Sequence, residues 1–273
     1  MRAINVHAHV RADKEGELKI SGMAIDKYVL ACKKLGVKKA CVSCLRNESK
    51  TNSNMLVYSM MERFPDFYVG MISSKMDELE PERIKYLVNL GFKGVKLIDP
   101  VADYNDKKCY KISDTAESLN IPILFHTGYV ASDYADPDMN YSRMRPLYLD
   151  HIARMFPKLK MIGAHLGTLS FFWEAIEVAK NNPNIYFDLT GGTIRMMPLS
   201  FFKMAFSVAA KPNLASTKEM IRPGLFEKFV FGTDNPEPKE LLTFYSNLMR
   251  LLKIKKPIQE KVFASTAEKL FKL

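Results

Sequence analysis

The strongest constraint on this chain is an alternation of short apolar runs with stretches of helical periodicity, repeated eight times along 273 residues. Short apolar runs next to turn residues predict buried strands, and apolar residues three and four apart predict helices. The apolar runs cover residues 3–6, 39–43, 67–72, 94–98, 122–125, 160–164, 185–189 and 229–231. The helical stretches cover residues 24–35, 54–64, 80–90, 110–119, 146–156, 169–180, 198–210 and 238–252, and residues 258–271 add one or two terminal helices.

Strands that alternate with helices form a parallel sheet with crossover helices. Eight such units in a chain close to the ~250 residues of a typical (β/α)₈ barrel favour a closed α/β TIM barrel over an open doubly wound sheet. No Gly-x-Gly-x-x-Gly motif follows the first apolar run, which argues against a dinucleotide-binding fold. The sequence therefore predicts a single domain over residues 1–273, with long loops at residues 11–23, 98–108, 129–145 and 209–226.

Four of the five histidines lie where a predicted strand ends. His7 and His9 end the first apolar run, and their i, i+2 spacing places both imidazoles on one face of a strand. His126 and His165 follow the fifth and sixth runs, and Asp234 follows the eighth. The carboxyl ends of the strands carry the active site in (β/α)₈ barrels, so these five side chains are predicted to converge there.

On these residues the chain resembles the amidohydrolase superfamily, specifically its amidohydrolase-2 (decarboxylase-like) branch. The resemblance spans the whole chain and rests on six segments. They are Asn-Val-His-Ala-His at 5–9, Gly-Phe-Lys-Gly-Val-Lys-Leu at 91–97, Phe-His-Thr-Gly at 125–128, residues 156–167, Phe-Gly-Thr-Asp-Asn-Pro at 231–236 and residues 265–271. Two positions depart from the family pattern: Asn5 stands where an aspartate is frequent, and Ile98-Asp99-Pro100 stands where His-Pro often follows.

The resemblance implies one divalent metal, with zinc as the first expectation and manganese or iron as alternatives. Its ligands would be His7, His9, His126 and Asp234, with water completing the shell. Three imidazoles and one carboxylate suit zinc, which lowers the pKa of a bound water toward ~7. The resemblance also implies catalytic roles for His165, as a base or a group that polarises a substrate oxygen, and for Asp234, as a metal ligand, a proton shuttle or both.

Lys96 ends the fourth apolar run, where some superfamily members carry a carboxylated lysine that bridges two metals. We instead expect an ion-paired lysine or an anchor for a substrate carboxylate, since this branch more often uses one metal. A second metal held by a carboxylated Lys96 is therefore not expected. Asp188, at the end of the seventh run, could orient a histidine from behind or could simply cap a strand end.

Further polar residues that follow predicted strands could bind a substrate carboxylate. They are Arg11, Arg46, Tyr129 and Arg195. For each one taken singly, a solvated loop position is the simpler interpretation. His151 falls within a helical stretch and is interpreted as structural or exposed.

The sequence therefore predicts a metal-dependent hydrolase that cleaves a C–N or C–O bond of a small substrate, which could carry a carboxylate. The main alternative is a non-oxidative decarboxylase, in which the metal holds substrate oxygens and a donor protonates the carbanion. A TatD-like nuclease also begins with His-x-His, but it is expected to carry a glutamate at the end of the fourth strand. The alternative outside enzymes is a metal-free binding protein, against which the presence of all five polar site residues argues.

The net charge of +10 comes from scattered Lys and Arg residues, so we expect a solvated basic surface without a nucleic-acid partner. No run of about 20 apolar residues is present and no signal peptide is recognised, so neither a membrane partner nor export is expected. The four cysteines, including the Cys41-x-x-Cys44 pair, are interpreted as reduced and mostly buried in a cytoplasmic protein. The expected partner is a small-molecule substrate, and a homodimer is left open.

Overall fold

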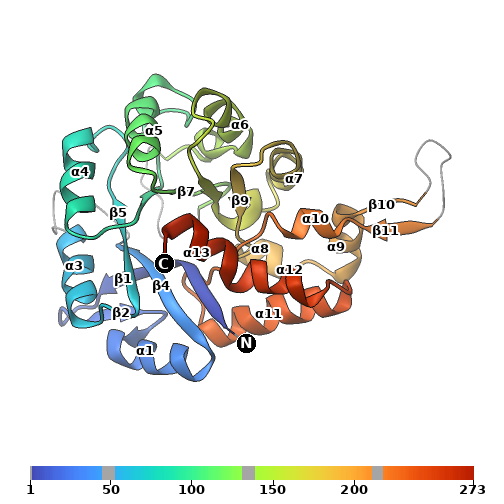
Figure 1. The fold of residues 1–273 in the computed structure, drawn as a ribbon, viewed down its shortest axis with the longest axis horizontal. Helices are drawn as coiled ribbons and strands as arrows, with labels where there is room; N and C mark the ends of the chain where they lie inside the picture. Colours follow the sequence, from blue (N-terminus) through green and yellow to red (C-terminus); the bar gives the residue numbers. More distant parts are fainter. Residues whose placement is uncertain (1, 45–52, 131–138, 211–217) are drawn as a thin grey trace.

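The computed structural model describes residues 2–44, 53–130, 139–210 and 218–273. Its main sheet, among these residues, has the strand order β3-β2-β1-β4-β5-β6-β7-β8-β9. Consecutive strands from β1 to β9, apart from the β2–β3 hairpin, pair in parallel and curve into a ring (Figure 1). The strands of this ring are β1 (Ala3–Ala12), β4 (Val37–Cys44), β5 (Tyr68–Ser73), β6 (Gly94–Leu97), β7 (Ile123–Phe125), β8 (Met161–Gly163) and β9 (Ile185–Phe187).

The eighth predicted strand closes the ring between β9 and β1. The Val230 N–H donates to the Phe187 carbonyl at 2.9 Å, and the Val6 N–H donates to the Phe231 carbonyl at 2.9 Å. Parallel bridges also join Phe187 to Phe229 and Ala8 to Asp234. The segment is not a regular strand, because the chain turns at Asp234, whose φ of 57° lies in the left-handed region. The predicted (β/α)₈ barrel is therefore confirmed, with a short and irregular last strand.

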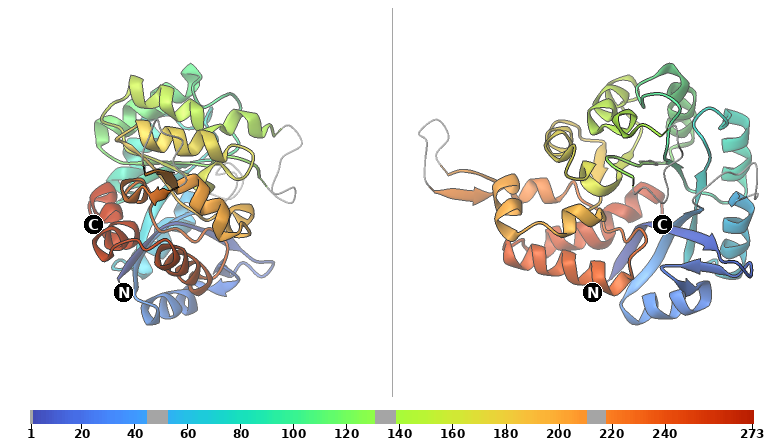
Figure 2. Two further views of the ribbon diagram at one scale, coloured as in Figure 1. Left: turned by 90° about the vertical axis from the view of Figure 1, so that its right-hand side faces the viewer. Right: turned by 180° about the vertical axis from the view of Figure 1, so that it is seen from behind.

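A helix follows each of the eight strand positions and covers the outside of the ring (Figure 2). These helices are α1 (Ile25–Lys34), α3 (Ser53–Arg63), α4 (Pro81–Asn89), α5 (Lys107–Leu119), α6 (Pro146–Met155), α7 (Phe172–Asn181), α9 (Leu199–Phe206) and α11 (Pro238–Leu251). α11 illustrates why these segments form helices that pack on the ring. It begins with a proline, at a position that needs no N–H donor, and its buried residues recur three and four apart, which gives the helix one apolar face. After the buried Pro238, those residues are Leu241, Leu242, Tyr245, Leu248 and Met249.

The C-terminal segment packs against one end of the barrel interior. It consists of α12 (Lys256–Glu260), a π-helical turn η4 (Lys261–Ser265) and α13 (Thr266–Phe271), and α13 lies across the middle of the ring in Figure 1. Leu270 and Phe271 of α13 belong to the same buried apolar cluster as Ile4 and Val6 of β1. Apolar side chains therefore fill the end of the barrel that α13 covers, and the polar groups described below lie at the opposite end.

One irregularity in β1 decides which side chains enter the barrel. Asn5 pairs with Ala40, whereas Ala8 pairs with Val42, so β1 carries one extra residue between these pairs. An extra residue of this kind is a β-bulge, and it reverses which alternate side chains face the interior. Val6 accordingly packs in the interior cluster, while His7 contacts groups inside the same barrel.

Two antiparallel hairpins lie where the sequence predicts loop or helix. β2 (Leu18–Ile20) pairs antiparallel with β1 within the predicted 11–23 loop, and β3 (Met23–Ala24) pairs antiparallel with β2 where that loop ends. The helix predicted over residues 198–210 ends at Phe206, because the backbone of β10 (Ser207–Ala209) pairs with β11 (Glu219–Ile221). This second hairpin projects from the body of the molecule (Figures 1 and 2).

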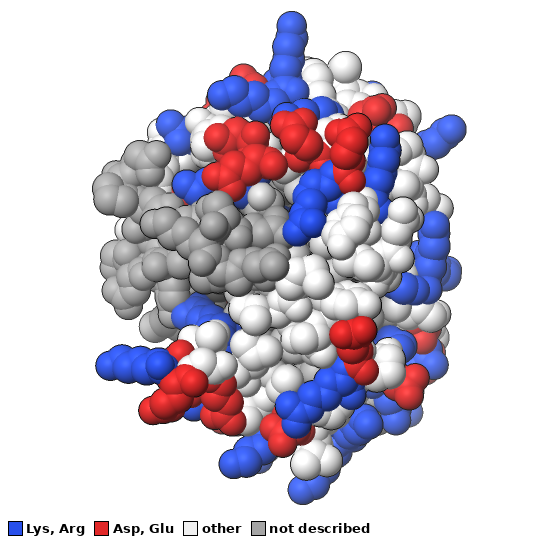
Figure 3. All heavy atoms as spheres, turned by 90° about the vertical axis from the view of Figure 1, so that its left-hand side faces the viewer, with Lys and Arg blue, Asp and Glu red and all other residues white. Residues whose placement is uncertain are grey.

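Within the described part of the chain, no helix is both long enough and apolar enough to cross a membrane. On the face shown in Figure 3, basic side chains are scattered among acidic ones, and no single-sign patch dominates the view.

Barrel closure generates a stability prediction at Tyr245. Its buried hydroxyl accepts a hydrogen bond from the Leu189 N–H at 2.6 Å and donates to the Val230 carbonyl at 3.1 Å, which joins the seventh strand position to the eighth. Tyr245→Phe is expected to lower the free energy of unfolding by about 1–3 kcal/mol, because both backbone groups lose a buried partner. Urea unfolding monitored by circular dichroism measures the change. The half-exposed Tyr86 provides the control, and Tyr86→Phe should change the same quantity by less than about 0.5 kcal/mol.

Candidate metal centre

The two imidazoles of the His-x-His motif meet inside the barrel. His7 Nε2 and His9 Nε2 lie 2.9 Å apart, and both rings are buried. Each ring is held from behind through its other nitrogen, His7 Nδ1 by Asp188 Oδ2 at 2.8 Å and His9 Nδ1 by the Ser43 hydroxyl at 3.0 Å. Since a carboxylate can only accept, His7 is protonated at Nδ1 and carries its lone pair on Nε2.

Asp234 completes a three-residue group with these histidines. Its Oδ1 lies 3.2 Å from His9 Nε2 and 3.7 Å from His7 Nε2. One ligand atom from each of the three residues falls within 4.8 Å of the others. The position of Asp234 depends on barrel closure, because its N–H donates to the His7 carbonyl at 2.7 Å.

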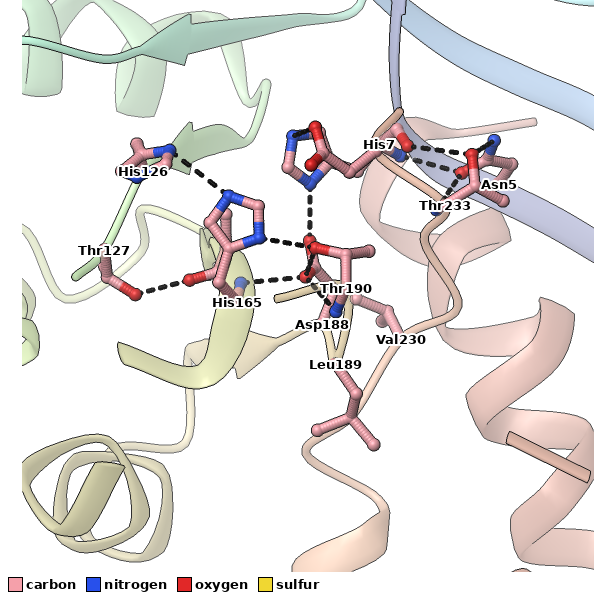
Figure 4. Close-up of polar contacts among 12 residues, drawn as sticks. Asn5, His7, His126, Thr127, His165, Asp188, Leu189, Thr190, Val230 and Thr233 are labelled. Carbon is pink, nitrogen blue, oxygen red and sulfur yellow. Dashed lines mark hydrogen bonds and ion pairs between the residues drawn. The ribbon is translucent and has the colours of Figure 1, made fainter. Parts of the chain in front are cut away.

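Asp188 lies behind the centre and connects its two halves. While Oδ2 accepts from His7, Oδ1 accepts from the His165 N–H at 2.9 Å, the Thr190 N–H at 3.1 Å and the Thr190 hydroxyl at 2.6 Å (Figure 4). Burial alone would raise the pKa of this carboxyl group, but His7 and these hydrogen bonds outweigh it and hold the pKa below its usual range. Of the two roles that the sequence left open for Asp188, the contacts favour orientation of a histidine.

His165 and His126 form the second half of the cluster. His165 Nδ1 lies 2.7 Å from the Thr190 hydroxyl, and His165 Nε2 lies 3.2 Å from His126 Nδ1. The other nitrogen of His126, Nε2, is buried and has no hydrogen-bond partner among the described residues. Buried polar atoms in proteins are almost always paired, so an unpaired imidazole nitrogen fits a position that receives a ligand. His126 lies outside the 4.8 Å group of His7, His9 and Asp234.

The histidines of the cluster are neutral at pH 7. Burial lowers the pKa of His7 to about 4 and that of His165 to about 4, with Lys96 adding to the effect at both. Burial also lowers the pKa values of His9 and His126. Neutral imidazole is the form that binds metal ions, so the barrel interior holds these rings in a binding-competent state without a change of pH.

Lys96 points into the cluster from β6. Its side chain is completely buried, and Nζ lies 3.2 Å from His7 Nε2. Burial lowers the pKa of this amine to about 8, against the attraction of Asp234 and Asp188. The direction of Lys96, which depends on the register of its strand, is thus toward the site. Its ammonium group can donate to an oxygen at the centre, either from a substrate carboxylate or from Asp234.

The remaining predicted substrate residues lie in different surroundings. Arg11 donates to Asn235 Oδ1 at 3.0 Å, next to Asp234. Arg195 of the short helix α8 (Gly192–Arg195) pairs with Glu240 at the start of α11, an ion pair that ties two helices together. Tyr129 is 54% exposed and packs edge-on against Tyr141, with a ring distance of 5.2 Å. Arg46 lies outside the described residues.

Two hydroxyl groups of the site had no predicted role. Ser43 ends the second strand and holds His9, and Thr190 lies two residues after Asp188 and contacts His165. Each follows or ends a predicted strand, as the histidines do, which is the one sequence signal that could have identified them. His151, by contrast, lies on α6 at the outside, where Nε2 meets the Tyr110 hydroxyl at 2.8 Å.

Comparison with known proteins identifies a family for most of the chain. The family model described as amidohydrolase matches residues 45–273. No curated protein matches the sequence significantly.

Solved structures similar to this one share its barrel. An uncharacterised TIM-barrel protein from Bordetella bronchiseptica is 20% identical, with a TM-score of 0.66 over 90% of this chain and 82% of the other. A candidate 2-pyrone-4,6-dicarboxylic acid hydrolase from Pseudomonas putida is 14% identical, with a TM-score of 0.66 over 100% and 98% of the two chains. A dihydroxybenzoic acid decarboxylase from Polaromonas, with bound manganese, is 15% identical, with a TM-score of 0.63 over 92% and 86%. At these identities the likeness concerns the fold.

The cysteines form no part of this centre and generate a prediction of low reactivity. All four are free and buried, and burial raises the pKa of the Cys41 and Cys44 thiols of the Cys-x-x-Cys pair. The reactive form of cysteine is the thiolate, so the native protein should react with Ellman's reagent at pH 8 far more slowly than the unfolded chain. Thiol titration before and after addition of guanidinium measures this. Rapid reaction of two thiols in the native protein would contradict the prediction.

Proposed function

Because the chain belongs to the amidohydrolase family, we propose that it is a metal-dependent hydrolase that cleaves a C–N or C–O bond of a small, carboxylated substrate. Members of this family are metal-dependent enzymes and include hydrolases and decarboxylases. Family membership leaves open the identity of the metal and its ligands, the proton-transfer residue and the charge of the substrate.

The observation that carries the proposal is the meeting of His7 Nε2, His9 Nε2 and Asp234 Oδ1 inside the barrel. Imidazole nitrogens 2.9 Å apart, with a carboxylate oxygen 3.2 Å from one of them, form a donor set that a divalent cation would satisfy. The hydrogen bond from His7 Nδ1 to Asp188 is the arrangement usual for a metal-bound histidine. His126 is the proposed fourth ligand, since its buried Nε2 is unpaired.

The donor set suits zinc and is also compatible with manganese or iron. The manganese in the Polaromonas decarboxylase keeps that alternative open for this chain. When bound, a divalent metal would supply Lewis acidity and lower the pKa of a coordinated water.

The chain's own residues would provide proton transfer and substrate binding. His165 is the proposed base. Its ring is neutral, its Nε2 faces the histidine cluster, and its Nδ1 contacts the Thr190 hydroxyl. Lys96 is the proposed anchor for a substrate carboxylate, because a buried ammonium group gains most from an anionic partner. Asp234 would hold the metal, and Arg11 at its neighbour Asn235 is a second candidate for contact with an anionic substrate.

Non-oxidative decarboxylation is the second candidate function. It is favoured by the likeness to the Polaromonas decarboxylase over 92% of this chain. In that reaction the substrate loses CO₂ from its carboxylate, and a proton takes the vacated position on carbon. Lys96 is the proposed donor, since its ammonium group points into the cluster.

The metal centre is tested by elemental analysis of purified protein and of His126→Ala. We expect about one divalent ion per chain in the wild type and a loss of at least tenfold in metal affinity in the variant, because a ligand is removed. His151→Ala is the matched control, since His151 lies on the outer helix α6, and it should retain the full metal content. Absence of metal from the supplemented wild type would refute the centre, and two ions per chain would indicate a carboxylated Lys96.

The substrate class is tested with Lys96→Met. Removal of the ammonium group should lower kcat/KM for carboxylated lactones and amides about 10- to 100-fold, because a charged hydrogen bond is worth roughly 1.5–3 kcal/mol. Analogues that lack the carboxylate should be affected little. Product analysis of the wild type separates the two reactions: ring-opened or cleaved acid without CO₂ supports hydrolysis, and CO₂ release supports decarboxylation. An equal loss for charged and neutral substrates would overturn the anchoring role.

A further inference from the structure

We propose that the hydroxyl of Thr190 sets the tautomers of His165 and His126, and so prepares one ring as a base and the other as a metal ligand. This inference rests on the proposed function for the use of the two rings, but the hydrogen-bond chain itself does not depend on it. Thr190 touches His165 and Asp188 and acts through them, so its role is that of a positioning residue.

The chain starts at Asp188, whose ionised carboxylate can only accept. Thr190 Oγ1 lies 2.6 Å from Asp188 Oδ1, a distance that requires a proton between the two oxygens. A threonine hydroxyl has a single proton, which is therefore directed to Asp188. Oδ1 receives this bond together with those from the His165 and Thr190 N–H groups, which keeps the carboxylate ionised and the direction of the bond unambiguous.

The next two links follow from that direction. Because the Thr190 proton points to Asp188, its oxygen must accept at its 2.7 Å contact with His165, so His165 carries its proton on Nδ1. A neutral His165 then has a lone pair on Nε2. His126 Nδ1 lies 3.2 Å from this atom and must therefore be the donor. Figure 4 shows the successive contacts from Asp188 through Thr190 and His165 to His126 as dashed lines.

The end of the chain is His126 Nε2. With the His126 proton on Nδ1, Nε2 carries a lone pair, and this buried atom has no partner among the described residues. The reversed chain would place a proton on His126 Nε2, where nothing in the described structure accepts it. It would also point the Thr190 proton at His165 and leave Thr190 Oγ1 and Asp188 Oδ1 2.6 Å apart with no proton between them. The contacts at Asp188 and at His126, the two ends of the hydrogen-bond chain, therefore favour the same direction of donation.

The consequence concerns two functions of the site at once. His165 has its basic nitrogen at Nε2, where it accepts from His126 Nδ1 until a substrate proton takes that place, and His126 has its Nε2 lone pair free for a ligand. Loss of the Thr190 hydroxyl leaves His165 Nδ1 without an acceptor, so His165 can move its proton to Nε2 and donate to His126 Nδ1. His126 would then hold its proton on Nε2, the atom needed for a metal.

Long-range ¹H–¹⁵N NMR of the imidazoles in the metal-free protein tests the chain directly. The protein has five histidines, and His151 on the outer helix serves as an internal reference. In the wild type, His165 and His126 are both expected to be protonated at Nδ1. Thr190→Ser should preserve this pattern, whereas Thr190→Val should shift the His126 proton to Nε2 and weaken metal binding by about tenfold or more.

Thr115→Val is the matched control, because Thr115 is a buried threonine of α5 whose hydroxyl donates to the Lys111 carbonyl away from the cluster. It should leave all the tautomers unchanged. A wild-type His126 protonated at Nε2 would overturn the proposal, even if Thr190→Val did not fold, and so would a Thr190→Val protein with the wild-type pattern. Tautomers that respond to Thr190 in a protein that binds no metal would support the chain and refute the proposed function instead.

Discussion

The carboxylate of Asp188 is the group on which the rest of the site depends. It is fully buried at the end of β9 and accepts four hydrogen bonds, which satisfies the acceptor capacity of an ionised carboxylate. A buried charge without such partners would be costly, and here each partner is itself an element of the site. One bond orients His7, a second holds the backbone at His165, and two hold Thr190. The two halves of the histidine cluster thus share one anchor.

Barrel closure and site assembly are the same structural event. The segment after Phe229 completes the ring by bonding to β9 and β1, and the same segment delivers Asp234 beside His7 and His9. Tyr245 reinforces this junction from α11. The opposite end of the barrel is filled by apolar side chains and the C-terminal helix α13, so packing stabilises one end while the polar groups occupy the other. This division follows the usual separation of stability and activity in (β/α)₈ barrels.

The predicted site residues divide according to how their positions were inferred. Residues placed by the end of a strand came together: His7 meets His9, and Lys96 points at His7. Residues that were selected only because they lie in a loop after a predicted strand did not converge on the histidine cluster. Arg195 is engaged by Glu240, and Tyr129 packs on Tyr141. The reason is physical, since a strand end has a fixed direction in the barrel, whereas the direction of a loop side chain depends on contacts that no local pattern encodes.

The amino-acid pattern was sufficient to predict the barrel, its order of strands and helices and the ring of polar residues at the strand ends, because hydrophobic periodicity and the parallel topology are local or nearly local properties. The sequence did not reveal the extra residue in β1 between Asn5 and Ala8, the β10–β11 hairpin or the hydroxyls of Ser43 and Thr190 behind the histidines. These features depend on pairing between segments distant in the chain. Which nitrogen of each imidazole faces its neighbours followed from the folded structure alone, because that choice depends on hydrogen bonds that Asp188 and Thr190 accept from histidines more than twenty positions away.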